Sequence, residues 1–215
     1  MKNNKETIIT DVDSVLLDWK YGLIHFLNEK GIPNDHIKDH LGSTSFLQPE
    51  FLFKEDKETS FKLLKEYNKS KWIGELPIFQ KGSDKIIKDL SEEHDFYAVT
   101  CIGIEPINQK LRIQNLQDIY GNIFSKHNVL TVDSHETKLP YLKYVKEKSK
   151  RIKFFIDDEI KHLNNALRIG IKPVLYTNDN KKTNNKNIEI IDCWSKALNI
   201  VNKENKLNFK HYNKI

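Results

Sequence analysis

The sequence predicts an α/β fold in which a parallel β-sheet carries helices on both faces. Short β-branched or aromatic runs alternate with helical patterns along most of the 215 residues. Such alternation requires crossover connections between parallel strands, and these crossovers are right-handed. Residues 32–76 break the alternation, because they show helical patterns alone. We therefore expect a sheet-based core with a small α-helical cap inserted after the first β-α unit.

Five strands are predicted from short runs rich in β-branched and aromatic residues. They are Thr7–Thr10, Phe96–Thr100, Asn128–Val132, Ile152–Ile156 and Pro173–Tyr176. Helices are predicted where apolar residues recur at spacings of three and four. They lie near Leu16–Leu27, Ser83–Ser91, Ile107–Tyr120, Leu139–Lys148 and Glu159–Ile169. The first of these helices is expected to stop at Gly31, which is followed by the helix breaker Pro33.

The predicted organisation has three parts. Residues 1–31 and 77–200 form the α/β core, residues 32–76 form the cap, and residues 201–215 form a basic C-terminal tail. The cap is expected to be helical, with its clearest helix over Glu58–Ser70, and to lie over the carboxyl edge of the sheet. The polar segment 177–187 is expected to be a loop.

Charge and composition exclude several classes of protein. The net charge of +5 comes with only three arginines, Arg112, Arg151 and Arg168, which disfavours a module that reads nucleic acid by bidentate contacts. Cys101 and Cys193 have no metal-binding or disulfide-framework spacing. The segment before the first strand lacks the apolar region of a signal peptide, and no run approaches the ~20 apolar residues of a membrane helix. We expect a cytoplasmic protein.

Polar residues follow three of the predicted strands. Asp11 and Asp13 come directly after the first strand, Thr100 ends the second, and Asp157 and Asp158 end the fourth. The carboxyl ends of parallel strands meet at one edge of the sheet, where open α/β folds bind ligands. The sequence therefore predicts one polar site at this edge.

These residues resemble the four motifs of the haloacid dehalogenase superfamily of phosphotransferases. The matching segments are Ile8–Leu16, Phe96–Thr100, Lys138 in E-T-K-L-P-Y-L, and Phe154–Asp158. The resemblance covers about Thr7 to Tyr176 and implies a Rossmann-like sheet with a closing cap. Ser14 departs from the pattern, because glycine or threonine is commoner there, and we expect little consequence.

The resemblance implies a Mg²⁺-dependent phosphatase. Asp11 would attack phosphorus, Asp13 would serve as acid and then base, Thr100 would bind a phosphoryl oxygen, and Lys138 would tie the phosphate to Asp11. Mg²⁺ would be held by Asp11, by the backbone carbonyl of Asp13, and by one or both of Asp157 and Asp158, since oxygen ligands suit this ion.

The expected substrate is a small phosphorylated metabolite, and we expect Val12, Cys101, Phe46 and Trp72 to contact it. Cys101 is not expected to be a nucleophile, because no histidine arrangement accompanies it. Asp18 and Trp19 look most like the 5'(3')-deoxyribonucleotidase branch, which would make the substrate a (deoxy)nucleoside monophosphate.

Several alternatives stay open. They are a sugar-phosphate or phosphoglycolate phosphatase, a phosphatase of nucleic-acid ends, and a non-catalytic binding module on the same scaffold. A dehalogenase is disfavoured, because carbon–halogen cleavage needs no second aspartate and Asp13 is present. The sequence leaves the oligomeric state open.

Overall fold

The computed structural model describes residues 5–134, 136–179 and 181–202. Its strands are β1 (Glu6–Thr10), β2 (His94–Thr100), β3 (Val129–Thr131), β4 (Ile152–Asp157), β5 (Pro173–Tyr176) and β6 (Glu189–Ile191). Its α-helices are α1 (Trp19–Lys30), α2 (Asp35–Lys38), α3 (Pro49–Phe53), α4 (Lys57–Asn68), α5 (Ser83–Glu93), α6 (Pro106–Tyr120), α7 (Leu139–Lys148) and α8 (Ile160–Arg168). Two 3-10 helices, η1 (Lys71–Gly74) and η2 (Gly121–Ile123), and a helical stretch over 194–202 complete the described chain.

The strands form one parallel sheet in the order β3-β2-β1-β4-β5-β6. The prediction of a parallel α/β sheet is thus confirmed. β1 lies between β2 and β4, so the direction of winding reverses at β1, and a crevice opens at the carboxyl ends of these strands. The sixth strand was not predicted, since it lies at the edge of the sheet with two of its three residues exposed and therefore shows no buried apolar run.

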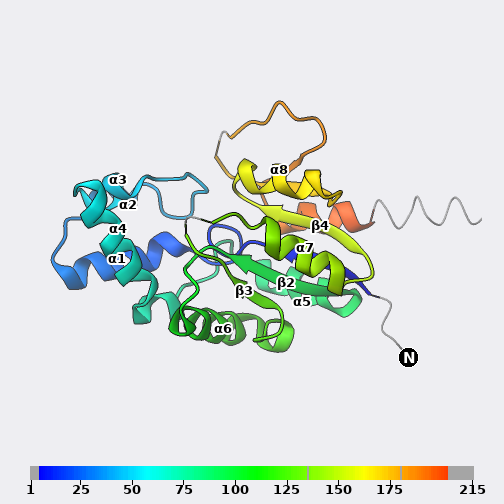
Figure 1. The fold of residues 1–215 in the computed structure, drawn as a ribbon, viewed down its shortest axis with the longest axis horizontal. Coiled ribbons are helices and arrows are strands. Elements are labelled where there is room, and N and C mark those ends of the chain that lie inside the picture. The colour runs from blue at the N-terminus through cyan, green and yellow to red at the C-terminus, as the bar shows by residue number, and fades with distance from the viewer. Residues whose placement is uncertain (1–4, 135, 180, 203–215) are drawn as a thin grey trace, which may run out of the picture.

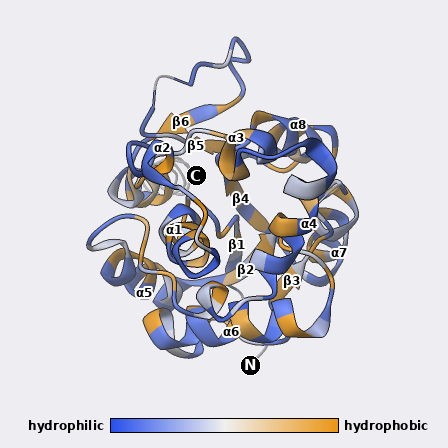
Figure 2. Ribbon diagram, turned by 90° about the vertical axis from the view of Figure 1, so that its left-hand side faces the viewer, coloured by the Kyte–Doolittle hydropathy of each residue, from blue (hydrophilic) through white to orange (hydrophobic). Residues whose placement is uncertain are grey.

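Helices cover both faces of the sheet, and strand residues alternate between two apolar clusters. One cluster joins strand residues such as Ile8 and Phe154 to α5, α6 and the stretch 194–202. The other joins their neighbours Ile9 and Phe155 to α7 and α8. Figure 2 shows α7 and α8 on one side of the sheet and α5 on the other. This two-sided burial explains why the strands read as continuous apolar runs.

A third apolar cluster holds the cap together, and α1 belongs to it. Leu23 and Leu27 of α1 pack with Ile37, Phe53 and Tyr67. Figure 1 shows α1 beside α2, α3 and α4, next to the carboxyl ends of β2 and β4. α1 therefore packs against the cap, and the predicted boundary at residue 31 stays a prediction. Helical periodicity shows that one face is buried but does not show against which partner.

The turn that links β1 to α1 is tight. The backbone N–H of Ser14 donates to the carbonyl of Leu17 at 2.9 Å, and Ser14 has a φ of 61°. A glycine would adopt this left-handed conformation without steric cost, so the departure at Ser14 has a small conformational consequence. The side chain of Asp18 then caps α1 by accepting from the N–H of Tyr21.

Two further expectations concern the ends and the membrane. Residues 203–215 of the predicted basic tail lie outside the described residues. Within the described ranges, no helix is both long enough and apolar enough to cross a lipid bilayer.

Candidate active site

Three predicted site residues meet at the carboxyl edge of the sheet because their strands are neighbours. Thr10 of β1 pairs with Ala98 of β2 on one side and with Ile156 of β4 on the other. Asp11 then follows β1, and its N–H donates to the carbonyl of Ile156 at 2.8 Å. This register places Asp11 between Thr100 and Asp157.

Lys138 comes to the same point from the start of α7. Its Nζ lies 2.7 Å from Asp11 Oδ1 and 2.8 Å from Asp157 Oδ2. Its side chain is 1% exposed, so its charge is balanced by carboxylates rather than by solvent. The sequence suggested this lysine by its place before a helix, and the structure brings it to the predicted aspartates.

The acidic cluster carries more negative charge than Lys138 balances. Oxygen atoms of Asp11, Asp157 and Asp158 all lie within 4.8 Å of one another. Burial, opposed by Lys138, raises the pKa of Asp11 to about 7. Burial and the neighbouring carboxylates also raise the pKa of Asp158. The three close carboxylates offer oxygen ligands and outnumber the one buried lysine, so the cluster fits a divalent cation such as Mg²⁺.

Asp13 lies beside this cluster and is held by two residues. Its Oδ1 accepts from Nη2 of Arg112 at 2.6 Å, and its Oδ2 accepts from the hydroxyl of Thr100 at 3.1 Å. The hydroxyl of Thr100 has one proton to donate, and here it goes to Asp13 rather than outward. The side chain of Asp13 is 22% exposed and lines a cavity.

Arg112 was not predicted as a site residue, although the sequence contains a signal for it. It stands four residues before Leu116 and eight before Tyr120 on α6, and all three are buried. This spacing places a charged side chain on the apolar face of the helix. Fully buried arginines are rare unless paired, so an arginine in such a stripe indicates a buried acidic partner.

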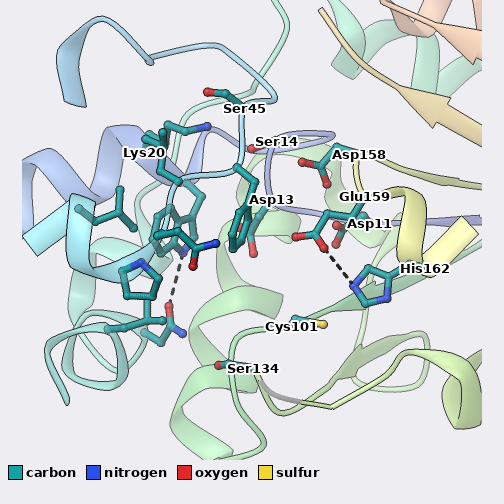
Figure 3. Close-up of a pocket in the computed structure, with 18 of the residues that line it drawn as sticks. Asp11, Asp13, Ser14, Lys20, Ser45, Cys101, Ser134, Asp158, Glu159 and His162 are labelled. Carbon is teal, nitrogen blue, oxygen red and sulfur yellow. Dashed lines mark hydrogen bonds and ion pairs between the residues drawn. The ribbon is translucent and has the colours of Figure 1, made fainter. Parts of the chain in front are cut away.

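The acidic cluster opens into a cavity of about 300 Å³ between core and cap. Asp11, Asp13, Cys101 and Asp158 lie on its core side in Figure 3, with Glu159 and His162 nearby. The cap contributes an apolar wall, which consists of Trp19, Phe46, Leu47, Pro49, Leu52, Phe61 and Leu64. The buried Lys20 and Asn68 add polar groups on the cap side.

The four predicted substrate contacts lie in different places. Cys101 and Phe46 line the cavity, whereas Val12 and Trp72 are not among its described lining residues. Val12 is fully buried, and its N–H donates to Asp11 Oδ1 at 2.7 Å. Trp72 stacks on His25, and its indole N–H donates to Glu29 at 2.8 Å.

The thiol of Cys101 is unsuited to nucleophilic attack. Burial raises the pKa of Cys101 to about 12, so it is protonated at neutral pH. Because the thiolate is the reactive form, Cys101 acts here as a wall of the cavity.

A strap from the cap, formed by the residues around Thr44, contacts the loop that follows β5. The N–H of Thr44 donates to Asn178 at 3.0 Å, and the hydroxyl of Thr44 contacts that of Thr177 at 3.1 Å. Nζ of Lys181 donates to the carbonyl of Thr44 and lies 3.8 Å from Asp158. The strap therefore ties the cap to the loop after β5. The sequence predicted this loop from its polar composition, and that composition did not reveal the contact with the cap.

No family model matches the chain. It is 33% identical over 209 residues to the "Uncharacterized 32.4 kDa protein in Gp30-rIII intergenic region" of Enterobacteria phage T4, covering 95% of this chain and 73% of that protein.

Three solved structures share the fold. A haloacid dehalogenase-like hydrolase from Streptococcus pneumoniae aligns with a TM-score of 0.63 at 15% identity, over 92% of this chain and 98% of its own. A magnesium-bound protein from Bacillus subtilis, assigned to the same hydrolases, aligns with a TM-score of 0.65 at 18% identity, over 93% of this chain and 99% of its own. A protein from Clostridium difficile, assigned as a phosphatase, aligns with a TM-score of 0.64 at 19% identity, over 93% of this chain and 100% of its own. The chain thus belongs to the family of the phage T4 protein and has the fold of the haloacid dehalogenase-like hydrolases.

Proposed function

We propose that the protein is a Mg²⁺-dependent phosphomonoester hydrolase that works through an aspartyl-phosphate intermediate. The observation that carries the proposal is the pairing of Asp11 with Lys138 at 2.7 Å, with Asp13 two residues further along the cavity wall. A carboxylate can attack a phosphate dianion only when nearby cations offset their repulsion. The names of the proteins that share the fold, hydrolases and phosphatases, support the same reaction.

Asp11, Asp158 and Asp157 are the proposed side-chain ligands of the metal, with the backbone carbonyl of Asp13. Mg²⁺ would supply positive charge against the phosphate and orient it. Asp158 lines the cavity, whereas both oxygens of Asp157 already accept hydrogen bonds, from Lys138 and from the N–H of Glu159. We therefore propose Asp158 as the more direct ligand of the two.

The residues can carry out the reaction in two steps. An oxygen of Asp11 bonds to phosphorus as the bond to the leaving oxygen breaks, and Asp13, which starts the cycle protonated, donates its proton to that oxygen. Water then attacks phosphorus, Asp13 takes the proton, and the bond to Asp11 breaks to release inorganic phosphate. Lys138 offsets the charge of the phosphate, and Thr100 donates to a phosphoryl oxygen in exchange for its present contact with Asp13.

The proposed substrate is a small phosphate ester whose leaving group has a planar apolar face, as in a nucleoside monophosphate. Trp19, Phe46 and Phe61 lie on the cap side of the cavity, where such a group could stack. The side chain of Asn68 would donate from Nδ2 to a base edge, since its Oδ1 accepts from the indole of Trp19 at 3.4 Å. A sugar phosphate offers hydroxyl groups that this apolar wall would leave unpaired.

A substrate panel with Mg²⁺ tests the proposal. It compares nucleoside monophosphates, sugar phosphates, 2-phosphoglycolate and a 3'-phosphorylated oligonucleotide, with Asp11→Asn as the inactive control. The highest kcat/KM is expected for a nucleoside monophosphate. A higher value for a sugar phosphate or for the oligonucleotide would overturn the substrate class. No turnover of any compound, p-nitrophenyl phosphate included, would favour a binding module instead.

A further inference from the structure

Arg112 is a buried charge on α6, behind the cavity rather than in it. Its side chain is 0% exposed, and Arg112 is not among the described residues that line the cavity. Within the described ranges, the ion pair of Arg112 joins Nη2 to Asp13 Oδ1 at 2.6 Å. Arg112 therefore meets the site through one atom of one residue.

The guanidinium group is only partly satisfied. Among the described residues, neither Nε nor Nη1 of Arg112 has a hydrogen-bond partner. A buried charge with unpaired donors disfavours the folded state compared with an apolar side chain of similar size. A contribution to stability is therefore a poor explanation for an arginine at this position.

The contact is better explained by what it does to Asp13. The carboxylate projects toward the cavity with 22% of its side chain exposed, so its orientation is not fixed by packing. Thr100 binds one oxygen from β2, and Arg112 binds the other from α6. Without substrate, these two donors from two separate elements define the plane of the carboxylate, and Arg112 keeps its contact when Thr100 turns to the phosphate in the proposed reaction. The Arg112 bond is the shorter and carries charge, which makes it the stronger of the two.

From this geometry we infer that Arg112 is a positioning residue, which holds the carboxylate of Asp13 in the orientation needed for proton transfer. The inference rests on the proposed function, in which Asp13 transfers protons to and from the reacting oxygens. Small errors in the placement of such a group reduce the rate strongly, because proton transfer requires hydrogen-bond geometry. Arg112 itself touches neither the substrate nor the metal in this scheme.

The test uses Arg112→Met, which keeps the length and removes the donors. Arg151→Met is the matched control, since Arg151 pairs with Glu6 at 2.7 Å on the exposed surface. With Mg²⁺, Arg112→Met is expected to lower kcat by at least ~10-fold for an alkyl phosphate, which needs Asp13 in both steps, and by less for p-nitrophenyl phosphate, which needs Asp13 only in the second step. KM should change little, and Arg151→Met should match the wild type. A kcat within twofold of the wild type for both substrates would overturn the inference.

A double-mutant cycle separates positioning from general damage to the fold. In an Asp13→Asn background, Arg112→Met should leave the residual p-nitrophenyl phosphate turnover unchanged, because the group that it positions is already missing. An equal loss in both backgrounds would mean that Arg112 acts on something other than Asp13. Arg112→Lys keeps one charged donor and should recover part of the rate; it also replaces Arg112→Met if that variant does not fold.

A readout without turnover keeps the inference separate from the proposed function. A crystal structure of the wild type should show the carboxylate of Asp13 in one orientation, and a crystal structure of Arg112→Met should show it in several. A single unchanged orientation in the variant would refute positioning even if the enzyme is active. If the wild type hydrolyses no phosphate ester, the proposed function fails, and the structural comparison still decides whether Arg112 orients Asp13.

Discussion

The two walls of the cavity differ in how their side chains are held. On the core side, the charged groups bind one another at short range: Lys138 lies 2.7 Å from Asp11, and Arg112 lies 2.6 Å from Asp13. On the cap side, the wall is mostly apolar, and Phe46 is 59% exposed. The core groups of the proposed reaction are thus held by short charged contacts, whereas Phe46 on the cap side is largely exposed to solvent. Substitutions in the core should change kcat, and substitutions in the cap should change KM.

The largest effect is expected from Asp11→Asn. The amide has nearly the same shape but cannot form an acyl phosphate, so turnover of p-nitrophenyl phosphate should fall by at least ~10³-fold, about 4 kcal/mol in the barrier. Asp133→Asn is the matched control, because Asp133 also follows a strand but is not among the described residues that line the cavity. Steady-state assays with Mg²⁺ measure both variants. Retention of a tenth of the activity in Asp11→Asn would contradict the assignment of the nucleophile.

A smaller but still large loss is expected from Lys138→Met. Removing the buried cation leaves the acidic cluster without its balancing charge and the phosphate without a partner, so kcat should fall by ~10²-fold. The exposed Lys143 of the same helix provides the control, Lys143→Met. If Lys138→Met and Lys143→Met had equal rates, the cluster would not need the lysine for chemistry.

The acidic cluster should also make the metal-free protein sensitive to pH. The pKa of Asp11 is raised from 3.8 to about 7, so the folded state binds this proton more tightly than the unfolded chain. The stabilisation of the folded state by protonated Asp11 is complete below the pKa of Asp11 in the unfolded chain, and it is lost as pH rises from about 4 to 7. It amounts to on the order of 4 kcal/mol.

Thermal unfolding in EDTA measures this dependence. Asp11→Asn should remove the contribution of Asp11 to the fall in stability between pH 5 and 8. Mg²⁺ should raise the Tm of the wild type more at pH 8 than at pH 5, since protonated carboxylates bind metal poorly. An equal Mg²⁺ effect at both pH values would place the ion away from this cluster.

The smallest effect is expected in the cap. Phe46→Ala should raise KM for a nucleoside monophosphate by ~5-fold and change p-nitrophenyl phosphate turnover by less than ~2-fold, because the small substrate makes few cap contacts. The control is Phe51→Ala, since Phe51 is another exposed aromatic of the cap that lies outside the described lining of the cavity. If Phe46→Ala lowered nucleoside monophosphate and p-nitrophenyl phosphate turnover equally, the expected difference between core and cap substitutions would be wrong.

The sequence predicted the core side of the site better than the cap side, for a physical reason. Asp11 directly follows β1, while Thr100 and Asp157 end β2 and β4, so the pairing of three strands is enough to bring them together. Arg112 reaches Asp13 from a helix, and such a contact depends on the rotation and packing of α6, which local patterns do not specify.

The cap depends on tertiary packing to a greater degree. The periodicity of α1 predicted a helix but not its apolar partners, and the position of Trp72 against His25 follows from how α1 meets η1. The contact between Thr44 and Thr177 joins residues 133 positions apart. Neither the contact of Trp72 with His25 nor that of Thr44 with Thr177 belongs to a pattern that a single sequence could reveal.

The most direct test of the account is to trap phosphate on Asp11. Wild type and Asp13→Asn, in which the second step should be slow, are mixed with p-nitrophenyl phosphate and Mg²⁺, quenched in acid and digested for mass spectrometry. We expect one phosphoryl group on the peptide that contains Asp11, more of it in Asp13→Asn, and none in Asp11→Asn. Release of nitrophenol from Asp13→Asn with no phosphoryl group on Asp11, or with the group on another residue, would contradict the account.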